Sequence, residues 1–181
     1  NARRRLQDEY DVSEEKYALA RSIAARQQPV LAASRANSYS LYVSIPFCPT
    51  RCAYCSFVSR TIQREAHLID PYLDKLEQEL AAIADITGEC GLKLETIYIG
   101  GGTPPALSLP QLEKLLAAVE THFDTAAARE YTVEAGRPDC TDYEKLALLK
   151  AHGVTRIPIN PQTMRDEVLA AIGRCHTAEE I

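Results

Sequence analysis

Three cysteines, Cys48, Cys52 and Cys55, lie within eight residues of the sequence and supply three thiols to one short segment. A structural zinc site normally takes four ligands from two separated pairs, and the sequence has no second pair at that spacing. The nearest histidine, His67, stands alone. An iron–sulfur cube held by three thiolates leaves one iron open to bind and reduce a small molecule. The ligand count therefore favours an iron–sulfur site, with a zinc or oxidised-thiol loop as the alternative.

Two further groups of residues suit ligand binding. The run Gly100 to Pro104 follows an apolar segment, and its glycines let the backbone approach a ligand without an intervening Cβ. No lysine follows the run, which argues against a nucleotide phosphate loop. Glu134 closes another apolar segment, where a carboxylate can accept hydrogen bonds from ribose hydroxyls. The alternative is a solvated glutamate at a strand end.

Short apolar strands alternate with amphipathic helices four times, which predicts an α/β fold of parallel strands joined by right-handed crossovers. The strands are predicted at 40–46, 96–99, 131–134 and 156–159. Three helices are predicted to begin at Asp70, at a capping box on Ser108 and at a second box on Thr141. A fourth is predicted over 164–172. The carboxyl ends of such strands carry the sites of α/β proteins. The cysteines, the glycine run, Glu134 and the segment 160–162 all follow strands and should share that edge.

The beginning and the end of the chain carry their own signals. Residues 7–28 have a helical apolar stripe followed by Pro29, which predicts one leader helix and a division into a leader, 1–39, and a barrel part, 40–181. A capping-box pattern at 177–180 predicts a helix start close to the last residue. We therefore expect these 181 residues to be an incomplete barrel without catalytic turnover of its own.

Composition narrows the functional class. The net charge is −5, and the densest basic run, Arg3 to Arg5, lies at one end, so nucleic acid is not an expected partner. No apolar stretch has the length of a membrane span, and no signal-peptide pattern opens the chain. These features predict a cytoplasmic protein with reduced thiols.

Several ordered motifs resemble the oxygen-independent coproporphyrinogen III oxidase group of radical S-adenosylmethionine (SAM) proteins, and its HemZ-type branch most. The resemblance runs from about Leu41 to Thr177. It rests on the segments 42–55, 100–104, 134–139 and 159–164. It implies part of a partial (β/α)6 TIM barrel. Ser44 departs from the group, which usually has histidine there.

The resemblance implies two cofactors, a [4Fe–4S] cluster on Cys48, Cys52 and Cys55, and SAM bound to the open iron. Reduction of the SAM sulfonium would give methionine and a 5′-deoxyadenosyl radical. The residues that would bind SAM, at the cluster or at a second site, are Tyr42, Tyr54, Gly101, Gly102, Thr103, Glu134, Gln162 and Arg174. Among them, Gly101 and Glu134 match positions for the cluster-bound SAM. Gly102, Thr103, Gln162 and Arg174 match positions for the second.

The activity implied by the resemblance is oxidative decarboxylation of coproporphyrinogen III to protoporphyrinogen IX in anaerobic haem synthesis. A one-electron donor such as flavodoxin or ferredoxin would be the protein partner, and the small-molecule partner would be a porphyrinogen or haem. One alternative is a HemW-like haem chaperone that keeps the cluster and SAM but binds and transfers haem. A second is a non-catalytic, zinc-stabilised α/β domain.

Overall fold

The computed structural model describes residues 2–57 and 60–181. These residues form two compact units, one within the range Asn1–Ala36 and one within Asn37–Ile181. We describe each unit by itself. Among the described residues, none of the helices combines the length and the apolar character needed to cross a bilayer.

The first unit contains two helices, α1 (Ala2–Tyr10) and α2 (Glu14–Ala33), where the sequence predicted one. Asp11, with a φ of 51°, turns the chain between them, and the Ser13 side chain caps α2 by accepting from the Lys16 N–H. The prediction that Pro29 ends the helix was wrong, because Pro29 lies inside α2. Proline removes one helical N–H, but its fixed φ is compatible with a helix, so α2 continues to Ala33.

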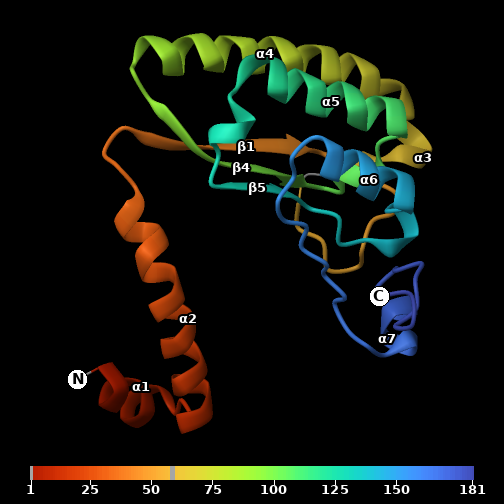
Figure 1. Cartoon of the computed structure of the whole chain (residues 1–181). Coiled ribbons are helices and arrows are strands. Elements are labelled where there is room, and N and C mark those ends of the chain that lie inside the picture. The colour runs from red at the N-terminus through yellow and green to blue at the C-terminus, as the bar shows by residue number, and fades with distance from the viewer. Residues whose placement is uncertain (1, 58–59) are drawn as a thin grey trace. The chain divides into compact units, whose positions relative to one another are not determined.

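The second unit is built on a parallel sheet of β1 (Ser38–Ile45), β4 (Lys93–Gly101) and β5 (Glu130–Val133), in the order β1-β4-β5 (Figure 1). These are the first three predicted strands. In the register, Leu41 lies opposite Ile97, and Ile97 opposite Tyr131. All three side chains are buried, which fixes the strands on the covering helices.

The fourth predicted strand, 156–159, does not form a strand. Only Arg156 makes a parallel bridge, to Thr132, and the chain then leaves the sheet. Pro158 has no N–H to donate to a ladder, and Ile159 is 53% exposed, so neither hydrogen bonding nor burial holds this segment in register.

Helices cover one face of the sheet, where Figure 1 shows α4 and α5 side by side. The capping box on Ser108 is confirmed, because Ser108 and Gln111 exchange both hydrogen bonds. The box on Thr141 is wrong. Asp142 is the cap, since its carboxylate accepts from the Lys145 N–H, while the Thr141 hydroxyl donates to the Ala135 carbonyl. The helices of this unit are α3 (Ile62–Glu65), α4 (Ile69–Glu89), α5 (Leu109–His122), α6 (Tyr143–Ala151) and α7 (Asp166–Ala171).

At the end of the described chain, the Thr177 N–H donates to the Glu180 carboxylate at 2.7 Å, which is one of the two hydrogen bonds of the predicted capping box. The Thr177 hydroxyl donates to the same carboxylate at 3.2 Å. The segment forms a turn and not a helix within the described residues. Single 3-10 turns connect the larger elements at Ala66–Leu68, Pro104–Ala106, Thr125–Ala127 and Pro138–Cys140.

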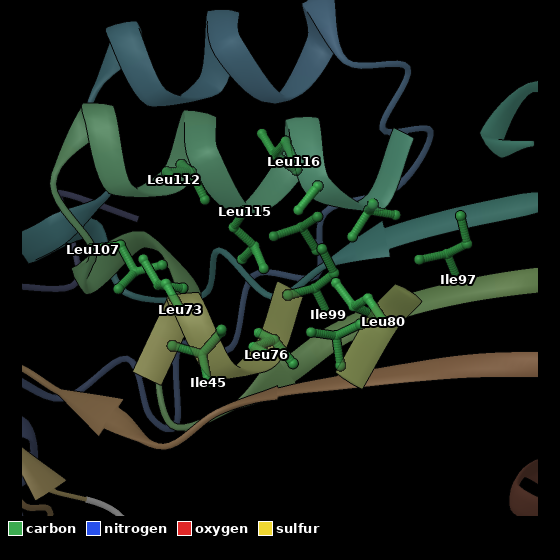
Figure 2. Packing of buried hydrophobic residues seen from close by; sticks show 14 of the residues in the cluster. Ile45, Leu73, Leu76, Leu80, Ile97, Ile99, Leu107, Leu112, Leu115 and Leu116 are labelled. Carbon is green, nitrogen blue, oxygen red and sulfur yellow. The ribbon is translucent and has the colours of Figure 1, made fainter. Parts of the chain in front are cut away.

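The core lies between the sheet and the two covering helices. Figure 2 shows Leu73, Leu76 and Leu80 of α4 and Leu112, Leu115 and Leu116 of α5 gathered over Ile97 and Ile99 of β4. Leu80, Leu116 and Ile99 are at most 1% exposed. This packing fixes the strands and leaves their carboxyl ends to carry the site.

A second, two-residue pairing holds the cysteine segment beside the main sheet. β2 (Phe47–Cys48) runs parallel to β3 (Arg60–Thr61), and the Arg60 N–H donates to the Pro46 carbonyl at 2.7 Å. The strand that carries Cys48 is thereby anchored at the point where β1 ends.

Candidate functional site

One cavity, of about 190 Å³, opens where the strands end. Cys48 follows β1, Gly101 ends β4 and Glu134 follows β5, so three strand ends contribute to it. All the predicted site residues except Tyr42 line this cavity, namely Cys48, Cys52, Tyr54, Cys55, Gly101, Gly102, Thr103, Glu134, Gln162 and Arg174. Segments more than 120 residues apart in the chain therefore meet at one place.

The cysteine loop presents three free thiols to the cavity. Cys48 is buried, Cys52 and Cys55 are half-buried, and the Cys55 N–H donates to the Cys52 carbonyl at 3.1 Å. Among the described residues, no three Cys, His, Asp or Glu side chains gather closely enough to hold a single metal ion. An iron–sulfur cube needs no such convergence, because each thiolate binds a different iron. Soft thiolates around one cavity are the right donors for that cluster.

The glycine turn packs directly against the cysteine strand. The Gly102 N–H donates to the Ile45 carbonyl and the Thr103 N–H donates to the Phe47 carbonyl, each at 2.8 Å. A Cβ on Gly102 would lie 2.6 Å from the Phe47 oxygen and 3.0 Å from the Cys48 Sγ. The Thr103 hydroxyl lies 3.4 Å from the same sulfur and donates to it. Only glycine fits at 102, and it keeps the thiol beside the turn.

Gly101 has a φ of 101°, a region that side chains disfavour. A Cβ there would also lie 2.7 Å from the Oγ of Ser44. Ser44 is the residue that departs from the resembling family, and its carbonyl accepts a hydrogen bond from the Tyr72 hydroxyl. The backbone at Gly101 therefore runs close to β1 with no room for a side chain.

Glu134 is held by a tyrosine from the neighbouring strand. The Tyr98 hydroxyl donates to Glu134 Oε1 at 2.5 Å, and this bond, with burial second, raises the pKa of Tyr98 to about 12. Tyr98 stacks on Tyr42, with ring centroids 5.8 Å apart. Tyr42, predicted to contact SAM, thus lies outside the residues that line the cavity and reaches Glu134 through Tyr98.

Arg174 offers unsatisfied donors to the cavity. One guanidinium nitrogen donates to the Tyr54 hydroxyl at 3.1 Å, while Nε and Nη1 are buried and have no hydrogen-bond partner among the described residues. Buried donors without a partner are costly, and a planar guanidinium matches a carboxylate. Gln162 has a φ of 69°, unusual for a residue with a side chain, and lines the cavity beside Asn160. These features suit a bound anion.

Arg137 also lines the cavity, although the sequence pattern did not single it out as a site residue. It is only 5% exposed and forms an ion pair with Asp139 at 2.7 Å. Burial disfavours its charge, but the hydrogen bonds and charge of Asp139 raise the pKa of Arg137 overall. The sequence holds one signal for this pair, the opposite charges two residues apart around Pro138. Burial of the pair was not visible in that pattern.

The radical SAM superfamily model matches residues 42–181. The oxygen-independent coproporphyrinogen-III oxidase-like protein HemZ of Bacillus subtilis is 41% identical over 97% of this chain and 36% of its own length. The haem chaperone HemW of the same organism is 41% identical over 78% of this chain and 36% of its own length. The structure of coproporphyrinogen III oxidase (HemN) from Escherichia coli, a radical SAM enzyme, has a TM-score of 0.71 and 29% identity over 94% of this chain and 36% of its own. The chain thus spans about a third of the length of these relatives.

Proposed function

Because the chain belongs to the radical SAM superfamily, whose proteins use a [4Fe–4S] cluster and SAM, we propose that its cavity holds both groups. The observation that carries the proposal is the meeting of three free thiols, a glycine turn and unpartnered guanidinium donors in one cavity. When bound, the cluster supplies one-electron reduction of SAM.

The chain's own residues bind and orient these groups. Cys48, Cys52 and Cys55 would each bind one iron of the cluster. The backbone at Gly101 would approach the SAM that binds the fourth iron. Glu134, kept in place by Tyr98, would accept hydrogen bonds from ribose hydroxyls. The unpartnered donors of Arg174, with Gln162, Gly102, Thr103 and Tyr54 nearby, would receive a carboxylate of a second SAM or of the substrate.

We propose that the full-length protein acts as an oxidoreductase on a porphyrinogen, converting coproporphyrinogen III to protoporphyrinogen IX by oxidative decarboxylation. A small donor protein would supply the electron that cleaves SAM, and the SAM-derived radical would take one hydrogen atom from each propionate that reacts. Each propionate would then lose carbon dioxide and pass one further electron to an electron acceptor. The likeness to the oxidase-like HemZ supports this over the haem chaperone, since it covers 97% of the chain and extends into the first unit. A HemW-like role in haem transfer is the second candidate, supported by the equal identity over a shorter segment.

The test is anaerobic reconstitution of the full-length protein with iron and sulfide, followed by dithionite and SAM. The proposal expects 5′-deoxyadenosine, and loss of coproporphyrinogen with formation of protoporphyrinogen. Stable haem binding without porphyrinogen turnover would favour the chaperone role. Zinc with neither iron nor sulfide after reconstitution would overturn both.

Cysteine variants test the ligand assignment. Cys52→Ala should lose the broad iron–sulfur absorbance, because one iron of the cube would lack its thiolate. Cys90→Ala is the matched control, since Cys90 is exposed and lies outside the cavity lining. A complete cluster with an unchanged spectrum in Cys52→Ala would show that the ligands are assigned wrongly.

A further inference from the structure

A buried cation stands next to the cysteine loop, and the proposed ligand set does not use it. Arg137 is 5% exposed, and the side chain of its salt-bridged partner Asp139 is 13% exposed. The Asp139 carboxylate accepts two hydrogen bonds from the Arg137 guanidinium, at 3.1 Å from Nε and at 2.7 Å from Nη2. This two-pronged contact fixes the plane and the direction of the guanidinium.

The free edge of the same guanidinium contacts the cysteine loop. Nη2 donates to the Thr50 hydroxyl at 3.1 Å, and Nη1 lies 3.5 Å from the Thr50 carbonyl oxygen. Thr50 lies between Cys48 and Cys52 in the sequence. The hydrogen bonds from Arg137 therefore hold the middle of the segment that carries both thiols.

The loop is tied from its other side as well. The Thr50 hydroxyl donates to the Gly173 carbonyl at 3.2 Å, and the Ala53 N–H donates to the Ile172 carbonyl at 3.1 Å. Gly173 precedes Arg174, whose guanidinium donates to Tyr54. Thr50 therefore connects Arg137 to the segment that carries the unpartnered donors of Arg174.

Charge gives this contact a second consequence. Arg137 and Cys52 line the same cavity, and a cluster bound there becomes more negative when it takes up an electron. Net charge and hydrogen bonding around a cluster set its reduction potential. A fixed positive charge stabilises the reduced form, and an adjacent carboxylate offsets part of that effect.

We propose that Arg137, oriented by Asp139, is a positioning residue that fastens the cysteine loop through Thr50 and a counter-charge that raises the cluster's reduction potential. The counter-charge role rests on the proposed function, because it needs the cluster. The fastening role concerns the chain alone and can be measured without any cofactor.

The fastening role is tested on the cofactor-free, full-length protein by limited trypsin digestion, with mass spectrometry to follow cleavage after Arg51. This residue is exposed and follows Thr50 directly. Loss of the Arg137 contacts should speed cleavage there roughly fivefold or more in Arg137→Gln, because the loop then opens more often. Lys114→Gln is the matched control, since Lys114 pairs with Asp74 between α4 and α5 and lies outside the cavity lining. Equal cleavage rates in Arg137→Gln and the parent would overturn the fastening role.

The counter-charge role is tested by the midpoint potential of the reconstituted cluster, measured by electron paramagnetic resonance in a redox titration. Arg137→Gln should lower the potential and Asp139→Asn should raise it, whereas Lys114→Gln and Asp74→Asn should change it little. A role in folding alone would not give opposite signs, so shifts of the same sign, or none, would overturn the counter-charge role. If Arg137→Gln assembles no cluster, Arg137→Lys and Asp139→Asn replace it. The lysine variant keeps the positive charge, so its potential should stay close to that of the parent, while Asp139→Asn should raise the potential. An unchanged or lowered potential in Asp139→Asn would then overturn the counter-charge role. A parent protein that assembles no cluster would overturn the proposed function and the counter-charge role, and the digestion result would still decide the fastening role.

Discussion

The leucine core and the cavity edge of the same sheet are built on different principles. Between the sheet and α4 and α5, apolar side chains hold the elements together by burial and close packing. At the carboxyl ends of the strands, the geometry is set by backbone hydrogen bonds, by glycines at which a Cβ would come within 3 Å of neighbouring atoms, and by the buried Arg137 with its ion pair. The core should therefore respond to lost volume, and the edge to added atoms or lost polar partners.

The largest effect is expected in the core. Leu80→Ala removes a side chain that is 1% exposed and should lower the free energy of unfolding by about 2–5 kcal/mol, through lost transfer energy and a residual cavity. Urea denaturation measures it. Ile86→Ala on the same helix is the control, because Ile86 is 59% exposed and should change stability by less than about 0.5 kcal/mol. Similar losses in both variants would mean that α4 does not bury the face described.

Adding one carbon at the edge should have the next largest effect. Gly102→Ala places a Cβ against the Phe47 oxygen and the Cys48 sulfur, so it should lower stability by about 1–3 kcal/mol and reduce iron incorporation. Gly88→Ala is the matched control. A Cβ at Gly88 meets nothing within 4 Å inside α4, and alanine there should raise stability by about 0.5–1 kcal/mol. Thermal denaturation and iron analysis of both variants would separate the two sites, and a neutral Gly102→Ala would contradict the close packing.

The smallest effect concerns one hydrogen bond. Tyr98→Phe removes the donor to Glu134 and should lower stability by about 0.5–1.5 kcal/mol. The folded-state pKa of Tyr98, about 12, lies above its ordinary value of 10. The contribution of the bond should thus be fully present below pH 10 and be lost as the pH rises toward 12. Unfolding measurements on parent and variant from pH 7 to 11 test this, and a difference that grows above pH 10 would have the wrong sign.

Sequence reasoning predicted what local patterns encode. Apolar runs located β1, β4 and β5, and Ser108 with Gln111 located the start of α5. The spacing of the cysteines and the position of the glycine run indicated a shared edge, because parallel strands bring their carboxyl ends together. The structure brings those segments to one cavity.

The sequence patterns gave wrong or missing predictions where contacts with residues far away in the sequence determine the structure. The segment 156–159 has strand composition, but Pro158 cannot join a ladder and only Arg156 does. Pro29 reads as a helix end, although α2 continues past it. The pattern around Pro138 paired Arg137 with Asp139 but did not mark Arg137 as a site residue, because its contact with Thr50 spans 87 residues of the sequence. Such contacts depend on tertiary structure, which composition and periodicity do not contain.

The parallel pairing of β1 with β4 also sets the order in which the protein can mature. Leu41 can meet Ile97 only after the segment between them, which includes α4, has been synthesised, and the cavity is complete only once Glu134 and Arg174 have followed. Contacts of such sequence separation form slowly, since loop closure costs entropy before any burial offsets it. During synthesis the three thiols therefore emerge from the ribosome well before their cavity exists. Insertion of a cluster is accordingly expected to be a late event that follows folding of the sheet.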